Sequence, residues 1–170
     1  TVQSWRGIEG GMHAAENEHY AIMSPTSHCY IDYPLDAIDL KKVYSFNPIP
    51  DSLSKDKQHY ILGGEVNMWT EHVPDEKNLD NKVFPRMLAL SEVLWSGTDT
   101  SRYKNFRNRV YNHFHVLDSL GVSYGAEAIP ITLITTGDST YITKNNRGID
   151  LQYQVEMEDC TMKFQQYESP

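Results

Sequence analysis

Short apolar runs alternate with amphipathic stretches along the first 120 residues of the chain. Three of the runs are typical of strands, at residues 1–5, 20–23 and 60–62. The clearest helical pattern follows Ser101, where four apolar side chains recur at i, i+4, i+8 and i+11, and Gly121 is expected to end that helix. The four apolar residues are Phe106, Val110, Phe114 and Leu117.

Helices are also predicted over residues 12–18, 36–43 and 85–95, the last with a proline in its first turn. Gly10 and Gly11 are expected to break regular structure after the first strand.

The helix that begins at Pro85 is predicted to run to about Trp95, with Met87, Leu90 and Leu94 on one face. Two other segments are expected to form no helix. Residues 27–33 are rich in aromatic side chains and are predicted to be extended, whereas the polar residues 70–81 are predicted to form a loop.

Alternating strands and helices favour parallel βαβ units, and therefore an α/β fold. Three units are present, whereas a closed (β/α)8 barrel needs eight strands. The pattern changes after Tyr124, where segments 131–134, 140–143 and 151–155 have β character.

Composition narrows the class of function. With 170 residues the chain is long enough for one domain with a core. The net charge of −8 argues against a nucleic-acid binder, which needs a basic face, and no run of about 18 apolar residues predicts membrane insertion. The chain opens at Thr1 in mid-strand, so we expect it to be a piece of a longer parent.

The metal-binding residue types form no recognisable motif. Cys29 and Cys160 lie 131 positions apart and are expected to be two separate buried thiols. The seven histidines include no His-Glu-x-x-His string, and there is no phosphate-binding or dinucleotide glycine motif. We therefore expect no metal and no cofactor.

Eight short strings follow one another along the chain, at residues 2–7, 22–25, 30–33, 44–50, 62–65, 68–71, 85–86 and 89–96. In this order and spacing they resemble family 20 of the glycoside hydrolases, the β-N-acetylhexosaminidases. The resemblance covers residues 1–122 and implies strands six to eight of a TIM barrel with their helices, a partial (β/α)8 barrel. Residues 123–170 would then be a β-rich tail or the start of an appended domain.

The resemblance implies a retaining, substrate-assisted reaction, in which the 2-acetamido oxygen of the sugar attacks the anomeric carbon. An Asp-Glu pair in a His-x-Gly-Gly-Asp-Glu string orients that group and protonates the leaving oxygen. This sequence has no such string, and Asp75-Glu76 lacks both the glycines and a preceding strand. The chain alone is therefore expected to be inactive.

Five residues match positions of the family's sugar site. Trp5 and Trp69 resemble the walls of the acetamido pocket, and Tyr30 resembles the phenol that positions the acetamido oxygen. Asp32 and Glu71 resemble the carboxylates that accept hydrogen bonds from sugar hydroxyls. The alternative is structural: barrel tryptophans, a half-buried tyrosine and solvated loop acids.

Four nearby residues are assigned supporting roles. Glu65 and Arg86 are expected to make structural polar contacts near the barrel rim, and Trp95 is expected to pack in the core or against a helix. For Arg6, an ion pair within the scaffold and a supporting role behind the site both stay open.

By resemblance, the parent hydrolyses terminal, non-reducing N-acetylglucosamine or N-acetylgalactosamine residues of glycans. It would be extracellular, periplasmic or lysosomal in type. The alternatives are a non-catalytic carbohydrate-binding or scaffold piece, and an unrelated parallel α/β domain. A third of a barrel leaves open sheet edges, so self-association is also expected.

Overall fold

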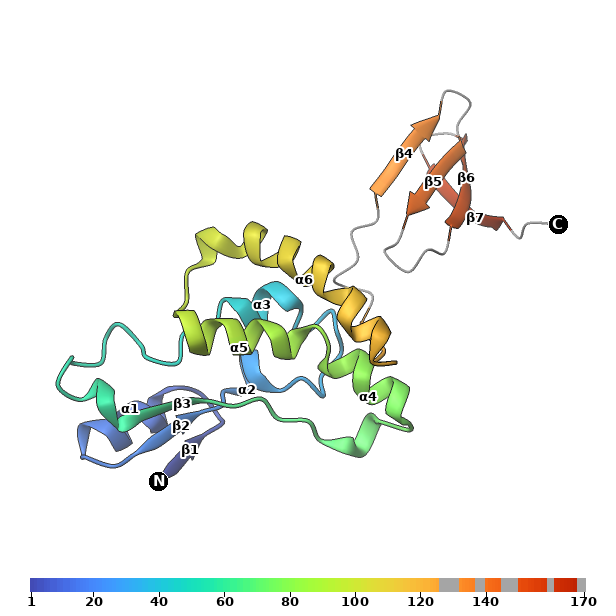
Figure 1. The fold of residues 1–170 in the computed structure, drawn as a ribbon. Coiled ribbons are helices and arrows are strands. Elements are labelled where there is room, and N and C mark those ends of the chain that lie inside the picture. The colour runs from blue at the N-terminus through green and yellow to red at the C-terminus, as the bar shows by residue number, and fades with distance from the viewer. Residues whose placement is uncertain (126–131, 137–139, 145–149, 159–160, 168–170) are drawn as a thin grey trace. The chain divides into compact units, whose positions relative to one another are not determined.

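The computed structural model describes residues 1–125, 132–136, 140–144, 150–158 and 161–167. The chain forms two compact units, Thr1–Ala128 and Ile129–Pro170, each of which is described by itself (Figure 1).

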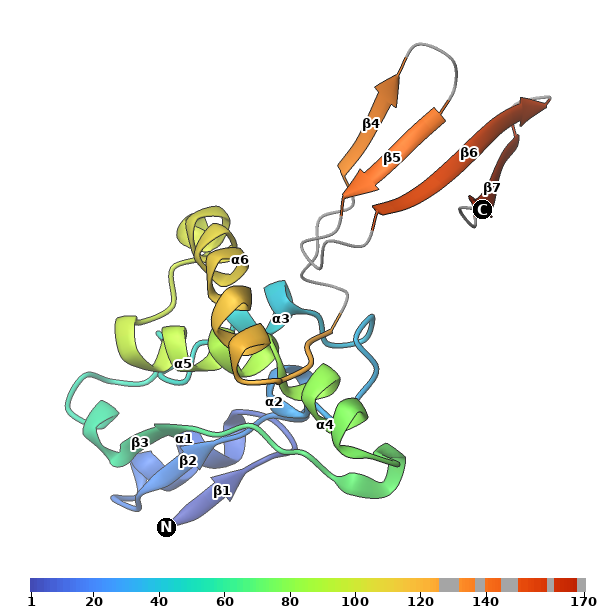
Figure 2. The same cartoon turned by 45° about the vertical axis from the view of Figure 1, so that its right-hand side comes forward.

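A parallel sheet of three strands organises the first unit: β1 (Val2–Ser4), β2 (Ala21–Met23) and β3 (Ile61–Gly64). The strands lie side by side in chain order, with Gln3 opposite Ile22 and Ile22 opposite Gly63. Helices are packed over one face of the sheet (Figures 1 and 2). The predicted βαβ organisation, and with it the α/β class, is confirmed.

The elements between the strands differ in detail from the prediction. They are α1 (Glu9–Glu16), α2 (Thr26–Cys29), α3 (Leu40–Tyr44) and the 3-10 turn η1 (Gln58–Tyr60). The helix expected at residues 36–43 begins at Leu40, because the Asp39 carboxylate caps it by accepting from Lys42 N at 2.7 Å.

The expected break at Gly10 and Gly11 is wrong, because both glycines lie within α1. A Cβ at Gly11 would come within 2.4 Å of the Met23 sulfur and 3.1 Å of Ser4 Cβ. Gly11 therefore lets α1 pack closely against the sheet, because the absence of a Cβ leaves room for the Met23 side chain. Glycine is a poor helix former, so this packing comes at some cost in helix propensity.

The segment expected to be extended at residues 27–33 is also wrong. Its first part is α2, in which Cys29 N donates to Pro25 O at 2.9 Å. A turn follows, closed by Tyr33 N donating to Tyr30 O at 3.2 Å. Pro25 has no N–H to donate, and Thr26, whose N–H still donates to Trp5 O at 2.8 Å, is the first residue of α2.

The loop predicted at residues 70–81 is wrong as well. The 3-10 turn η2 (Thr70–His72) and helix α4 (Glu76–Val83) occupy it. Asp75 caps α4 by accepting from Asn78 N at 2.7 Å. The same segment carries few apolar residues, so hydrophobic periodicity gave no helix signal there.

Helix α5 (Arg86–Ser96), the turn η3 (Thr100–Arg102) and helix α6 (Tyr103–Ser119) complete the first unit. The predicted stripe of α6 is confirmed, since all four of its members are buried. The apolar face predicted for α5 is only partly buried: Leu90 is buried, but Leu94 is 39% exposed. The buried face of α5 instead consists of Arg86, Ala89, Leu90 and Val93.

The second unit is an antiparallel sheet in the order β4-β5-β6-β7. The three β segments expected after Tyr124 correspond to the first three strands, and a fourth follows them. The strands are β4 (Thr132–Thr136), β5 (Thr140–Lys144), β6 (Asp150–Glu158) and β7 (Thr161–Tyr167). Cys160 lies outside the described residues, whereas Cys29 is a free, buried thiol.

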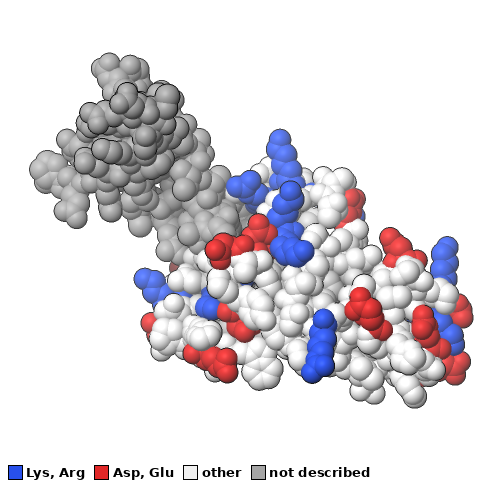
Figure 3. All heavy atoms as spheres, turned by 180° about the vertical axis from the view of Figure 1, so that it is seen from behind, with Lys and Arg blue, Asp and Glu red and all other residues white. Residues whose placement is uncertain are grey.

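Acidic and basic side chains are interspersed over the face of the first unit shown in Figure 3. Among the described residues, no helix has both the length and the apolar character needed to cross a bilayer.

Candidate functional site

The carboxyl ends of the three parallel strands lie at one edge of the sheet. Backbone hydrogen bonds extend the ladder past the strands themselves: Ser24 N donates to Ser4 O at 2.9 Å, and Thr26 N donates to Trp5 O at 2.8 Å. On the other side of β2, Glu65 N donates to Met23 O at 3.1 Å. In parallel α/β folds, ligands bind at this edge.

Tyr30 is joined to the chain that follows β3 through a parallel bridge with Asn67. Asn67 N donates to Cys29 O at 2.8 Å, and Ile31 N donates to Asn67 O at 3.0 Å. The Asn67 amide also donates to the hydroxyl of Ser24. These bonds bring the loop carrying Tyr30 and Asp32 beside the segment carrying Trp69 and Glu71.

Trp5 lies directly after β1 and is 43% exposed. The Arg6 guanidinium lies over the indole ring, 4.9 Å from its centroid, which is cation–π geometry. Of the two roles left open for Arg6, this contact favours support of the Trp5 ring. A hollow of about 300 Å³ lies here, and Trp5, Gln3, Arg6 and Glu9 are among its lining residues.

Arg86 fixes the loop that carries Asp32. Its side chain is fully buried and donates to four backbone carbonyls. Those carbonyls belong to Ile31, Tyr33, Ile38 at 2.8 Å and Lys82 at 2.9 Å. The structural role expected for Arg86 agrees with these contacts, since a buried guanidinium is stable only where its donors are used.

One oxygen of the Asp32 carboxylate, Oδ1, is buried and accepts no hydrogen bond from the described residues. The backbone oxygen of the same residue accepts from Lys82 Nζ. The neighbouring Tyr30 and Tyr33 rings meet edge to face at 5.9 Å. A buried acceptor without a donor is costly, so Asp32 is ready to accept a hydrogen bond from a bound group.

The remaining two candidates are more open to solvent. Trp69 is 58% exposed, and Glu71 lies on the exposed turn η2. No hydrogen bond, ion pair or ring contact joins the side chains of Trp5, Tyr30, Asp32, Trp69 and Glu71 to one another. The backbone bonds thus bring the segments that carry the five residues to one edge of the sheet.

Three titratable groups near the sheet have shifted pKa values. Burial raises the pKa of the Cys29 thiol to about 12, and the nearby Glu65 carboxylate adds to this effect. Burial lowers the pKa of His28, whose Nδ1 lies 2.8 Å from the Ser27 hydroxyl. The backbone N–H of Asn78 lowers the pKa of Asp75, which fits a helix cap and leaves that carboxylate poorly suited to proton donation.

The sequence alone did not indicate that Gln3 and Asn67 contribute to the site. The Gln3 amide donates to the Glu65 carboxylate across β2, and Asn67 donates to Ser24. A signal for Gln3 was available, because it lies two residues before Trp5 on a strand and so shares a face with it.

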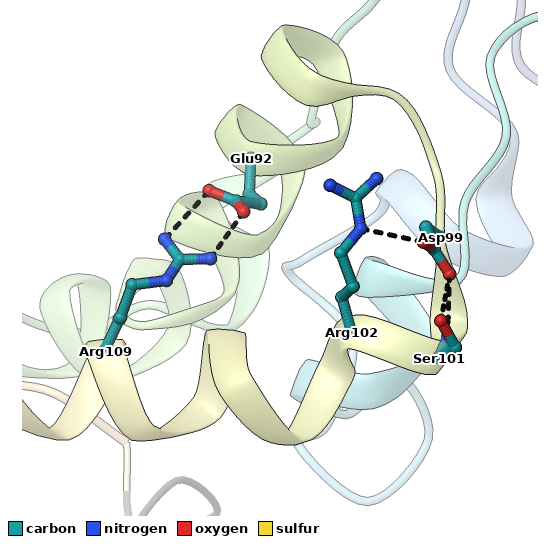
Figure 4. A network of polar contacts seen from close by, with 5 residues as sticks. All are labelled: Glu92, Asp99, Ser101, Arg102 and Arg109. Carbon is teal, nitrogen blue, oxygen red and sulfur yellow. Dashed lines mark hydrogen bonds and ion pairs between the residues drawn. The ribbon is translucent and has the colours of Figure 1, made fainter.

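Away from this edge, a pocket of about 370 Å³ lies between α5 and α6, and half of its lining residues are apolar: Leu88, Trp95, Phe106 and Val110. Trp95 lies at this pocket and is 93% exposed, so its expected packing role is wrong. Beside it, Arg109 donates to both carboxylate oxygens of Glu92, at 2.6 Å and 3.2 Å (Figure 4). A second ion pair, Arg102 with Asp99 at 2.7 Å, lies at the start of α6 (Figure 4).

Within the part of the chain that the structure describes, no group of three or more His, Cys, Asp or Glu side chains is arranged to hold a metal ion. The polar groups of the edge are amide, hydroxyl, phenol and carboxylate groups flanked by indole rings. Such a set suits a neutral polyhydroxylated ligand: ring faces pack on its C–H groups, and the polar groups exchange hydrogen bonds with its hydroxyls.

Comparison with known proteins defines the class. The model of the glycosyl hydrolase family 20 catalytic domain matches residues 1–98. A β-hexosaminidase of Porphyromonas gingivalis is 32% identical over 160 residues, which cover 87% of this chain and 20% of that protein. A β-N-acetylhexosaminidase of Cellulomonas fimi is 28% identical, over 66% of this chain and 25% of that protein. The chain therefore belongs to glycoside hydrolase family 20.

Solved structures agree on the fold. The family 20 β-N-acetylhexosaminidase of Streptomyces coelicolor superposes with a TM-score of 0.62 at 25% identity, over 77% of this chain and 30% of that chain. The family 20 exo-β-N-acetylglucosaminidase of Vibrio harveyi was solved with N-acetylglucosamine. It superposes with a TM-score of 0.64 at 24% identity, over 73% of this chain and 22% of that chain. The chain thus spans between a fifth and a third of the length of these relatives.

Proposed function

We propose that this chain is the part of a retaining, substrate-assisted β-N-acetylhexosaminidase that contains barrel strands six to eight. Its substrates would be glycans that end in a non-reducing N-acetylhexosamine. In this proposal, residues 1–122 belong to the barrel and residues 123–170 form a β-rich tail or the start of an appended domain. Family membership and the parallel order of β1, β2 and β3 support the assignment.

The observation that carries the proposed sugar site is the buried, unpartnered Oδ1 of Asp32 at the carboxyl edge of the sheet. A sugar hydroxyl would supply the missing donor, and Glu71 would accept from a second hydroxyl. Trp5 and Trp69 would enclose the acetamido methyl group between their rings.

The role proposed for Tyr30 is electrostatic. Its phenol would donate to the acetamido oxygen, which holds that oxygen below the anomeric carbon and stabilises the oxazolinium ion as it forms. The bridge to Asn67 fixes the backbone of Tyr30 for this purpose. The proton for the leaving oxygen would come from an Asp-Glu pair that this sequence lacks. The chain would therefore supply the binding wall without the acid.

The assignment predicts binding without turnover. Purified chain mixed with a chromogenic N-acetyl-β-glucosaminide should release no chromophore, because loss of a general acid alone costs on the order of 10² to 10⁴ in rate. Titration with N-acetylglucosamine, followed by tryptophan fluorescence, should saturate. Turnover sensitive to an oxazoline-mimicking inhibitor would contradict the absence of an acid.

Matched variants separate the site from the rest of the surface. Tyr30→Phe and Trp69→Ala should weaken binding of N-acetylglucosamine. Tyr20→Phe and Trp95→Ala should not, since Tyr20 precedes β2 at the opposite end of the strand and Trp95 lies on α5. Equal losses in both pairs would exclude a specific site at the carboxyl edge. A non-catalytic carbohydrate-binding piece is the second candidate, favoured by the missing His-x-Gly-Gly-Asp-Glu string.

Two further proposals concern the chain's surroundings. Among the described strands, β1 and β3 each pair on one side only, so we propose self-association through these edges. Sedimentation velocity that shows monomer across a wide concentration range would contradict this. We also propose that the parent is an extracellular, periplasmic or lysosomal type of glycosidase, as its resemblance implies.

A further inference from the structure

Gln3 and Glu65 form a side-chain hydrogen bond that crosses the middle strand of the sheet. The Gln3 amide nitrogen donates, and Oε1 of the Glu65 carboxylate accepts. Gln3 lies on β1 and Glu65 directly follows β3, so the two backbones are separated by β2, a span of about 10 Å at ordinary strand spacing.

Each partner of this bond is tied closely to one of the two candidate pocket tryptophans. Gln3 precedes Trp5 by two residues, so the two side chains share a face of the strand, and both line the same hollow. Glu65 precedes Trp69 by four residues.

The backbone between Glu65 and Trp69 is held in place rather than free. Glu65 N donates to Met23 O at 3.1 Å, Asn67 is bridged to Tyr30, and Trp69 itself is extended, with φ −85° and ψ 131°. A shift of Glu65 toward or away from β1 would therefore be transmitted to Trp69. Backbone hydrogen bonds join β1 to β2 and β2 to β3, but no described strand pairing joins β1 to β3 directly.

We propose that Gln3 and Glu65 are positioning residues, whose hydrogen bond sets the separation of Trp5 and Trp69 and so the width of the acetamido slot. The inference rests on the proposed function for its ligand, but its structural part does not. Neither residue needs to touch the sugar. Their hydrogen bond links the two walls of the slot directly across β2. The backbone ladder links them only indirectly, through the pairing of β1 with β2 and of β2 with β3.

The chain contains three tryptophans, which makes the coupling directly measurable. In a ¹H–¹⁵N spectrum the indole N–H groups of Trp5, Trp69 and Trp95 give separate signals, assigned by single Trp→Phe variants. Glu65→Ala should shift the signals of Trp5 and Trp69 together and leave that of Trp95 unchanged, because the Trp95 side chain is exposed on α5 and no hydrogen bond or ring contact among the described residues joins it to Gln3 or Glu65. Glu16→Gln, an exposed change on α1, is the matched control and should move none of the three.

A charge-swapped pair tests whether the bond itself matters. Gln3→Glu combined with Glu65→Gln exchanges donor and acceptor, and should return both signals toward their wild-type positions. Gln3→Glu alone places two carboxylates together and should displace both signals. Affinity for N-acetylglucosamine should fall roughly threefold to tenfold in Glu65→Ala and recover in the swapped pair, as expected for loss of one hydrogen bond.

The outcomes separate this inference from the proposed function. Trp5 and Trp69 signals that stay unmoved in Glu65→Ala, or a swapped pair that restores neither signal, would overturn the inference. If Glu65→Ala unfolds, the Trp95 signal moves as well. In that case Gln3→Leu and the swapped pair are used instead: Gln3→Leu should shift the Trp5 and Trp69 signals but not that of Trp95, and the swapped pair should restore them. Wild-type chain that shows the predicted indole coupling but binds no N-acetylglucosamine would instead contradict the proposed sugar site.

Discussion

The rings of Phe114 and Tyr124 stack face to face, with centroids 4.1 Å apart and planes inclined by 3°. Phe114 lies on α6, whereas Tyr124 lies beyond the end of that helix, so the contact folds the chain back onto the first unit. The backbone agrees, since Gly125 N donates to Phe84 O at 2.8 Å and Ser123 N donates to Asp80 Oδ2 at 3.0 Å.

Tyr124→Ala should therefore destabilise the first unit, by about 3–4 kcal/mol, the cost of removing a buried ring and leaving a cavity. Urea unfolding followed by far-UV circular dichroism measures it. Tyr124→Phe keeps the stack and should cost much less. A small effect of the alanine variant would mean that residues 123–125 contribute little to the first unit.

Replacing Arg86 should damage the loop of Tyr30 and Asp32 as well as overall stability. Arg86→Met leaves buried carbonyl groups without donors, and each such group costs about 1–3 kcal/mol. We expect a loss of at least about 3 kcal/mol in the free energy of unfolding, with increased hydrogen exchange at residues 31–38. Arg86→Lys keeps the positive charge but not the planar set of guanidinium donors. Its free energy of unfolding should therefore lie between that of Arg86→Met and that of wild type.

Hydrogen exchange identifies the mechanism of that loss. Exchange that increases evenly over the whole first unit, with no excess at residues 31–38, would show that Arg86 acts only on global stability.

The Glu92–Arg109 pair gives a pH-dependent prediction. The hydrogen bonds from Arg109 lower the pKa of Glu92 in the folded chain, so the pair stabilises the fold above the unfolded-state pKa of Glu92, and the gain is lost as pH falls through the lower folded value. Because the Arg109 side chain is 53% exposed, the contribution is only about 0.5–1 kcal/mol.

Glu92→Gln should thus lower the free energy of unfolding by about 0.5–1 kcal/mol at pH 7, and by progressively less below about pH 4.5. Parallel urea titrations of wild type and variant at several pH values test it. High salt should also reduce the difference at pH 7, because the pair is partly exposed. A difference that is independent of pH would show that packing, and not charge, is responsible.

Cys29 should be chemically inert in the folded chain. With a pKa of about 12, its thiolate fraction at pH 8 is on the order of 10³-fold below that of a thiol with the ordinary pKa of 9.0. In a Cys160→Ser variant, which leaves one thiol, an aromatic disulfide reagent should therefore react slowly until urea unfolds the chain. Rapid labelling of the folded variant would contradict the burial of this thiol.

The parts of the fold with strong periodicity were predictable from the sequence. The α6 stripe and the three parallel strands follow directly from apolar spacing. Helix α4 was not predictable in this way. The segment has few apolar residues, and the one sequence feature that indicates a helix is Asp75, which can cap its first turn. Gly11 was misread because its role is close contact with Met23, which only the tertiary structure reveals.

The candidate site was predicted by resemblance rather than by periodicity. Strand ends located Trp5, but the short helix α2 that sets the position of Tyr30 was missed. Trp95 was misassigned because an apolar residue on an amphipathic helix is usually buried, whereas here α5 turns Val93 inward and leaves Trp95 in solvent. The Gln3–Glu65 bond joins residues 62 positions apart, a distance at which sequence spacing carries no information.

The contacts of Arg86 also set an order of events during synthesis. The loop of residues 31–38 depends on a side chain that lies 48 to 55 positions further along the chain. At ordinary translation rates that interval is roughly 2–11 seconds, and the residues of β1, β2 and α1 have been synthesised before it begins. The loop carrying Tyr30 and Asp32 therefore takes its final form only once α5 has emerged from the ribosome.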